Sequence, residues 1–90
     1  MEAPKILGRA ADCIGDRAAE RDSDSERSMA KTVAAFNALT GASLTETQGW
    51  TFMAVLKLAR ASQGRFQMDD YIDGAAYIGL AGESASRDGS

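Results

Sequence analysis

The sequence predicts an all-α fold, a compact bundle of about four helices formed by a single domain over residues 4–83. Three observations favour this class. The chain has 90 residues, a hydrophobic fraction of 44% and one proline, which is typical of a folded helical domain. Apolar residues recur at spacings of three and four in several segments. Short polar or glycine-containing stretches separate these segments, as expected for antiparallel neighbours in a bundle.

A first helix is expected from residue 4 to about residue 20. Pro4 suits its first turn, where the missing N–H has no intrahelical partner to lose. Apolar residues then recur at helical spacing, namely Ile6, Leu7, Ala10, Cys13 and Ile14. Residues 20–27, ERDSDSER, predict a polar connector in which Asp24 or Ser25 caps the next helix.

The second helix is indicated by one apolar stripe, which consists of Met29, Val33, Phe36 and Leu39. We expect this stripe to face the core. Gly41 follows the last turn and predicts the end of the helix, because glycine readily adopts the left-handed conformation found there.

The third helix has the strongest local signal in the chain. Thr45 and Gln48 match the capping box, in which each side chain bonds the backbone N–H of the other residue. The helix that begins there should cover residues 46–62 and end at Gln63 and Gly64. Its apolar residues lie nearly all round, so we expect it to be the central and most buried helix.

The fourth helix should begin at Asp69 or Asp70, whose carboxylates suit a helix N-terminus. Gly74, Gly79 and Gly82 lie inside it, and each lowers helix stability by up to about 1 kcal/mol relative to alanine. These glycines predict the close approach of another backbone, from the same chain or from a second subunit. Residues 84–90 are expected to form a disordered tail.

Composition excludes several classes of function. The net charge of −3 disfavours nonspecific binding to nucleic acid, which needs a basic surface. The chain has no histidine, which excludes histidine-based catalysis and the usual zinc ligands. Its one cysteine, Cys13, is expected to be a structural thiol.

No secretory signal or membrane span is apparent, so we expect a cytoplasmic protein. The core is thin for an isolated domain, which favours a homo-oligomer.

Four charged residues on either side of the turn at Gln63 and Gly64 form the candidate site. Lys57 and Arg60 share a face of the third helix, and Asp70 and Asp73 share a face of the fourth. If the two helices are antiparallel, Arg60 falls near Asp70 or Asp73. The group is then either an ion pair that sets helix register or, together with Tyr71, a site for a small anionic, nucleotide-like ligand.

A metal site is the third interpretation of the same carboxylates. Asp12 and Asp16 would join Asp70 and Asp73 if the first helix packs alongside. Ligands that are all oxygen suit Mg²⁺. Otherwise no cofactor is expected.

The C-terminal half resembles a family of small helical domains of unknown function that is common in tailed phages and prophages. The resemblance rests on a Lys-x-x-Arg, a glycine, and an Asp-x-Tyr-x-Asp segment followed by small residues and an aromatic residue. Here these are Lys57, Arg60, Gly64, Asp70 (or Asp69), Tyr71, Asp73 and Tyr77. Residues 15–41 resemble the first half of the family and include the pair Asp16 and Arg17. The resemblance covers about residues 5–84 and implies a helical fold and a phage or prophage origin.

The segment Asp70-x-x-Asp73 is also similar to a magnesium-binding motif of the all-α nucleoside triphosphate pyrophosphohydrolases of the MazG type. That family has a Glu-x-x-Glu on an earlier helix, which this chain lacks. Asp12 and Asp16 are the residues that would replace it.

The leading hypothesis is a noncatalytic phage or prophage accessory protein in the host cytoplasm, which self-associates and binds a host protein or a nucleotide-like ligand during host takeover or counter-defence. The alternatives are a magnesium-dependent nucleotide pyrophosphohydrolase and a structural protein of the virion.

Overall fold

Four helices account for the secondary structure of the described residues, and their bounds follow the sequence signals closely. The structure is a computed structural model that describes residues 1–20 and 28–88, with the backbone alone for residues 16–20. The helices are α1 (Ala3–Glu20), α2 (Met29–Thr40), α3 (Glu46–Ala61) and α4 (Met68–Asp88). The prediction of an all-α bundle of four helices is therefore confirmed, whereas the expected connector and its caps at Asp24 or Ser25 lie mostly outside the described residues.

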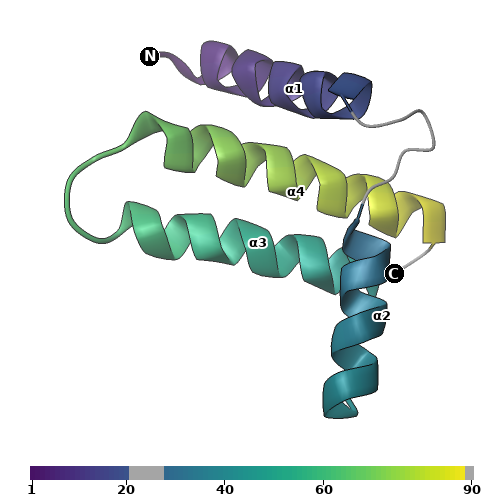
Figure 1. Ribbon diagram of the computed structural model, residues 1–90. Helices are drawn as coiled ribbons and strands as arrows, with labels where there is room; N and C mark the ends of the chain where they lie inside the picture. Colours follow the sequence, from purple (N-terminus) through teal and green to yellow (C-terminus); the bar gives the residue numbers. More distant parts are fainter. Residues whose placement is uncertain (21–27, 89–90) are drawn as a thin grey trace.

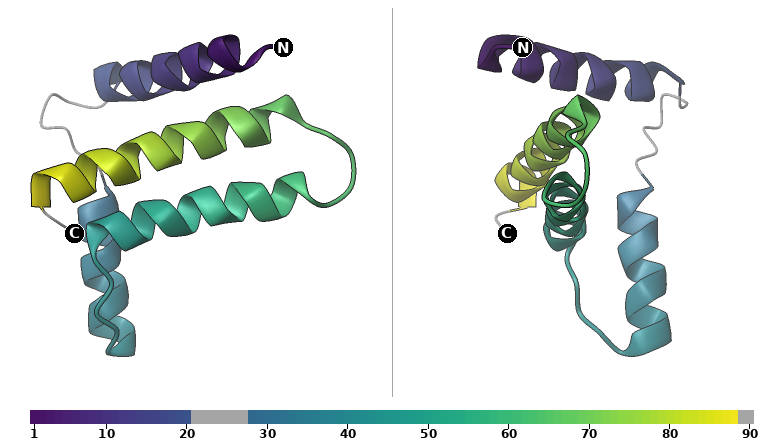
Figure 2. Two further views of the ribbon diagram at one scale, coloured as in Figure 1. Left: turned by 180° about the vertical axis from the view of Figure 1, so that it is seen from behind. Right: turned by 90° about the vertical axis from the view of Figure 1, so that its left-hand side faces the viewer.

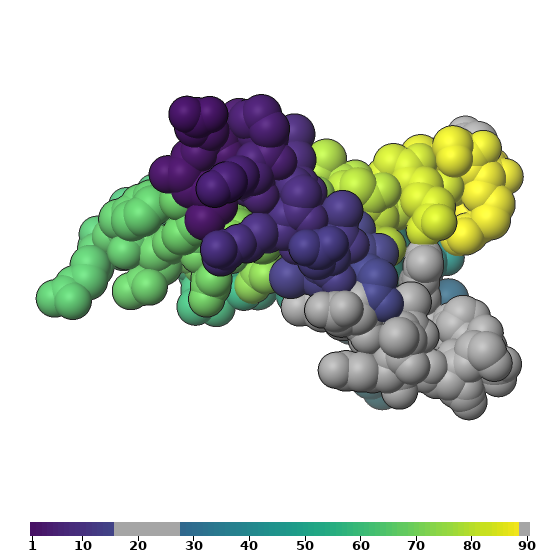
Figure 3. Space-filling view, turned by 90° about the horizontal axis from the view of Figure 1, so that it is seen from above, coloured from purple at the N-terminus to yellow at the C-terminus, as the bar shows by residue number. Residues whose placement is uncertain are grey.

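Helix α4 lies between α1 and α3, and α3 and α4 form an antiparallel pair joined by the loop at residues 62–67 (Figure 1). Helix α1 crosses the other side of α4 and leaves the C-terminal turns of α4 visible beside it (Figure 3). Helix α2 packs against the N-terminal end of α3 and projects away from it (Figure 2). The chain thus consists of a three-helix layer with α2 as an arm.

The central helix is α4 and not α3, so that part of the sequence interpretation was wrong. The bounds expected for α3 are confirmed, but four of its large apolar side chains are exposed, namely Phe52, Val55, Leu56 and Leu58. The reason is that α3 has a neighbour along its length on one side only. Helix α4, which has α1 on one side and α3 on the other, buries residues of both core clusters.

The core consists of two adjoining clusters. The larger one lies where α2, α3 and α4 meet and contains Met29, Val33, Trp50, Leu80 and Ala81. The smaller one lies between α1 and α4 and contains Ala10, Ile72 and Ala76, with Cys13 and Ile14 partly buried against them. Two of the three buried residues of the smaller cluster are alanines, which let α1 and α4 approach closely.

The apolar stripe of α2 is buried over only half its length, which corrects the expectation for the other half. Met29 and Val33 are buried against α3, but Phe36 and Leu39 are exposed because α2 extends beyond the end of α3. The helix ends as predicted at Gly41, whose φ of 78° is left-handed and whose N–H donates to the carbonyl of Asn37.

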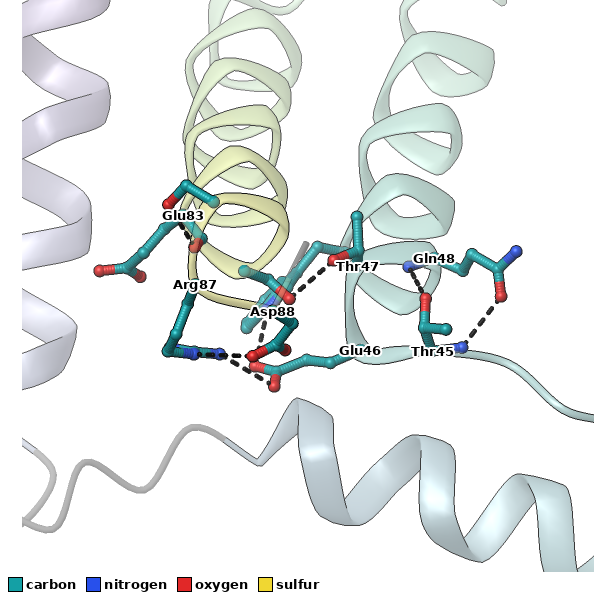
Figure 4. Close-up of polar contacts among 10 residues, drawn as sticks. Thr45, Glu46, Thr47, Gln48, Glu83, Arg87 and Asp88 are labelled. Carbon is teal, nitrogen blue, oxygen red and sulfur yellow. Dashed lines mark hydrogen bonds and ion pairs between the residues drawn. The ribbon is translucent and has the colours of Figure 1, made fainter. Parts of the chain in front are cut away.

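The two ends of the α3–α4 unit show one confirmed cap and one corrected boundary. The capping box of α3 is present, since the Thr45 hydroxyl accepts from the Gln48 N–H at 3.0 Å and the Gln48 side chain accepts from the Thr45 N–H at 2.9 Å (Figure 4). Helix α4 begins at Met68, so Asp69 and Asp70 lie in its first turn and do not cap it.

Helix α4 continues to Asp88, which contradicts the expected tail for residues 84–88. Ser84 is buried and its hydroxyl lies 2.7 Å from that of Thr47 on α3. One turn further on, Arg87 forms an ion pair with Glu46. These contacts with α3 stabilise the last turns of α4 as helix.

Within one chain, the close helix approach at a glycine occurs at Gly49 of α3 and not at the glycines of α4. A Cβ atom added at Gly49 would overlap the side chains of Met29 and Val33 on α2. At Gly74 and Gly79 an added Cβ would make only ordinary contacts, and at Gly82 it would meet nothing within 4 Å. Within the described part of the chain, no helix combines the length and apolar character needed to cross a lipid bilayer.

Candidate functional site

The antiparallel packing of α3 and α4 brings together the four charged residues singled out from the sequence. The Nε atom of Arg60 lies 3.5 Å from Oδ1 of Asp70, and Nζ of Lys57 lies 3.3 Å from Oδ2 of Asp73. The pairs are one turn apart because Lys57 and Arg60 are three residues apart on one helix and the aspartates are three apart on the other. The expectation that Arg60 falls near Asp70 is confirmed.

The two pairs differ in which member is shielded from water. The side chain of Asp70 is 6% exposed, whereas that of its partner Arg60 is 59% exposed. In the second pair Lys57 is 13% exposed and Asp73 is 24% exposed. A carboxylate as buried as that of Asp70 needs a nearby cation or hydrogen-bond donors, since an isolated buried charge is strongly unfavourable. The pairs therefore hold the register of α3 on α4.

Tyr71 belongs to a different surface from these ion pairs. It is exposed, and its ring stacks on that of Phe66 in the preceding loop with centroids 5.9 Å apart. Residue 71 points away from α3 because it adjoins Asp70, which faces that helix, and neighbouring positions of a helix diverge by about 100°. The ligand site expected from the sequence is thus divided between two faces of α4.

The carboxylates of the magnesium alternative do not form a cluster among the side chains that the structure describes. Within that set, no group of three or more Asp, Glu, Cys or His residues could hold a metal ion. Asp12 is exposed on α1, while Asp70 and Asp73 are engaged with Arg60 and Lys57. The side chain of Asp16 lies outside the described residues.

A second polar group joins the other end of the same two helices, and the sequence interpretation missed it. Glu46 at the start of α3 accepts from the indole N–H of Trp50 at 3.3 Å and pairs with Arg87 of α4 at 3.2 Å (Figure 4). The hydroxyls of Thr47 and Ser84 meet beside it at 2.7 Å. Arg87 and Ser84 were missed because they follow Glu83 in a stretch of small and polar residues that carries no apolar periodicity.

Polar contacts thus hold both ends of the α3–α4 pair, and the apolar clusters lie between them. The ion pairs give the charges on these two otherwise apolar helices partners within the chain. This arrangement leaves the exposed aromatic and aliphatic side chains as the features that the internal packing does not use.

Comparison with known proteins assigns the chain to a family but to no activity. No curated protein and no solved structure matches it. One family model, described as a domain of unknown function, matches residues 5–85. Since that match covers nearly the whole chain, the protein belongs to the family of domains of unknown function DUF6378.

Proposed function

We propose that this protein is a noncatalytic accessory protein, encoded by a phage or prophage, which self-associates and binds a host protein in host takeover or counter-defence. The origin rests on the resemblance of the Lys57 to Tyr77 segment to domains common in tailed phages and prophages. Membership of a family of unknown function is compatible with this role and adds no activity to it.

The noncatalytic part of the proposal rests on how the charged residues are used. Lys57 and Arg60 are the cations that would attract an anionic substrate, and both are paired with aspartates of α4. A cation already neutralised by a partner contributes less to binding an anion than an unpaired one does. The chain also has no histidine to act as a general base near neutral pH.

The binding part rests on the outer face of α4, which we call the α4 face. Tyr71, Ile78 and Gly82 share that face because they are spaced by seven and four residues. Phe66 extends it through its stacking on Tyr71. The exposed fractions are 64% for Phe66, 42% for Tyr71 and 56% for Ile78, which is high for large apolar residues.

The surroundings of the α4 face suit a partner that binds and dissociates. Arg65 and Glu83 are exposed and adjoin Phe66 and Gly82 in the sequence. An apolar centre with a polar rim is the usual composition of a nonobligate protein interface. Gly82 adds a place where a partner can approach the backbone, since nothing lies within 4 Å of an added Cβ. This exposed apolar face is the single observation that carries the proposal.

The test uses the full chain immobilised at equal density in three forms, the wild type, Ile78→Glu and Leu7→Glu. Leu7 of α1 is the matched control, because its exposed fraction of 62% is close to the 56% of Ile78 and it lies outside the α4 face. We expect a bacterial host lysate to yield one protein that the wild type and Leu7→Glu retain and Ile78→Glu loses. Equal retention by Ile78→Glu would contradict the proposed face.

A nucleotide-like ligand at Lys57, Arg60, Asp70, Tyr71 and Asp73 is the second candidate. The observation in its favour is that the Arg60 side chain is 59% exposed despite its ion pair, so water and solutes reach it. This candidate requires a thermal shift with a panel of nucleotides and cyclic dinucleotides that disappears in Arg60→Ala. A flat response across the panel would exclude it.

A further inference from the structure

A second apolar surface lies on the opposite side of the molecule from α1, on the arm α2, the loop that follows it and the outer side of α3. We call it the neutral surface. Six large apolar side chains are exposed on it, namely Phe36, Leu39, Leu44, Phe52, Val55 and Leu56. The α3 members are spaced by three and one residues, and Ala59 continues the row, so they form a stripe directed away from α4.

The neutral surface differs from ordinary solvent-exposed helix surface in having almost no charge. Residues 32–45 contain no Asp, Glu, Lys or Arg, and neither do residues 47–56. Glu46 stands between these stretches, but it is half-buried and paired with Arg87. Depletion of charge is typical of the centre of a protein interface and is strongest in homodimers. A surface without charge is also complementary to itself, because no like charges meet across a two-fold axis.

The arm α2 is held to the rest of the chain by only part of its length. Met29 and Val33 contact α3 around Gly49, and beyond them Phe36 and Leu39 are exposed. A helix of 12 residues is marginally stable on its own in water, so most of its stability must come from packing. The structure of one chain supplies that packing for the first half of α2 and leaves the second half without it.

From the lack of charge and the projecting arm together, we infer that the neutral surface is covered by a second copy of this chain. The dimer is isologous, with the exposed half of each α2 lying against the outer stripe of the partner's α3. Two-fold symmetry makes both contacts at once, since α2 and α3 lie at an angle to one another (Figures 1 and 2). A copy of the chain is also the one partner that is present whenever the chain folds, which suits a surface needed for stability.

This inference deepens the self-association in the proposed function and rests on it. The host partner is assigned to the α4 face, so the two proposals can fail separately. Substitutions at Phe52 test the dimer, and substitutions at Ile78 test the host partner.

The first experiment is sedimentation velocity of the full chain over a range of concentrations, for the wild type, Phe52→Glu and Leu7→Glu. The exposed fractions of Phe52 and Leu7 are 67% and 62%, so neither change removes a core side chain from the monomer. We expect the wild type and Leu7→Glu to sediment as dimers of twice 9.5 kDa. Phe52→Glu buries two unpaired carboxylates in each dimer, and we expect its dissociation constant to rise at least about 100-fold. Unchanged helicity by circular dichroism shows that the variant is folded.

The second experiment identifies the contact itself. A photo-crosslinking amino acid at position 36 is activated in a mixture of ¹⁴N- and ¹⁵N-labelled chains, and the products are mapped by mass spectrometry. We expect mixed-label products in which residue 36 is joined to residues 52–59. A monomeric wild type overturns both the dimer and the proposed self-association. A dimer that Phe52→Glu leaves intact, or crosslinks confined to other segments, overturns the neutral surface as its interface.

Discussion

The contact between α2 and α3 makes Gly49→Ala an informative substitution. A methyl group at this position would lie 2.8 Å from Cγ1 of Val33 and would overlap the sulfur of Met29. Real Cβ atoms do not approach other atoms so closely. The thioether of Met29 is flexible and can move, but Val33 is buried and its branched side chain has one strongly preferred rotamer in a helix. The arm α2 must therefore shift away from α3.

The magnitude follows from two opposing effects. Alanine is favoured over glycine in a helix interior by up to about 1 kcal/mol, whereas overfilling a packed contact lowers stability by about 1–3 kcal/mol. Gly82→Ala is the matched control, because the same change in α4 meets no heavy atom within 4 Å. The gain in helix propensity is common to both variants. We therefore expect Gly49→Ala to be less stable than Gly82→Ala by about 1–3 kcal/mol, with Gly82→Ala more stable than the wild type.

Urea denaturation followed by circular dichroism at one fixed protein concentration measures this difference. The fixed concentration matters because self-association would add to the apparent stability by mass action. Equal stability of the two alanine variants would refute the close packing of α2 on α3. A loss of stability in Gly82→Ala would show that a backbone or side chain approaches Gly82 after all.

Three further predictions concern the polar contacts of α3 and α4. Removing residues 84–90 should lower the free energy of unfolding by about 1–2 kcal/mol relative to removing residues 89–90. The reason is that the buried hydroxyl contact of Ser84 and the ion pair of Arg87 are lost. Equal stability of the two truncated chains by urea denaturation would mean that the last turns of α4 contribute nothing. Arg60→Ala should lower stability by about 1 kcal/mol, and a double-mutant cycle with Asp70→Ala should assign most of that loss to the pair; independent effects would refute the pairing. Thr45→Ala should lower the melting temperature through the loss of about 1 kcal/mol of capping energy, whereas an unchanged melting temperature would contradict the capping box.

Local signals in the sequence predicted most of the fold. The bounds of α3 followed from the capping box at Thr45 and Gln48, and the end of α2 followed from Gly41. Both signals depend on hydrogen bonds or dihedral angles within a few residues, which tertiary structure seldom overrides. The antiparallel relation of α3 and α4 then followed from the short loop between them, and with it the pairing of Arg60 with Asp70.

The parts that were predicted wrongly depend on which helices are neighbours in space. The apolar residues of α3 indicate burial all round, yet Phe52 and Val55 are exposed because no described element covers that side. Periodicity cannot distinguish a side chain that meets the core of its own chain from one that meets another chain. The exposed apolar residues are therefore the part of the pattern that points to interaction.

The last turns of α4 and the approach at Gly49 were missed for a related reason. Ser84 and Arg87 have no apolar spacing, and only the position of Thr47 and Glu46 on α3 gives them partners. The sequence analysis singled out the three glycines of α4. Within the chain, however, the glycine at which a side chain would collide with another helix is Gly49, which packs against α2. Neither feature is encoded within a window of a few residues.

The central claim is that the α4 face, and not the charged cluster of Lys57, Arg60, Asp70 and Asp73, binds the partner. The most direct test compares host-protein retention by two variants, Ile78→Glu and the double variant Lys57→Met/Asp73→Leu. The double variant replaces both charges of a partly buried pair with apolar groups of similar size, which is often nearly neutral for stability. We predict that the double variant retains the host protein and that Ile78→Glu loses it. Loss by the double variant together with retention by Ile78→Glu would contradict the claim.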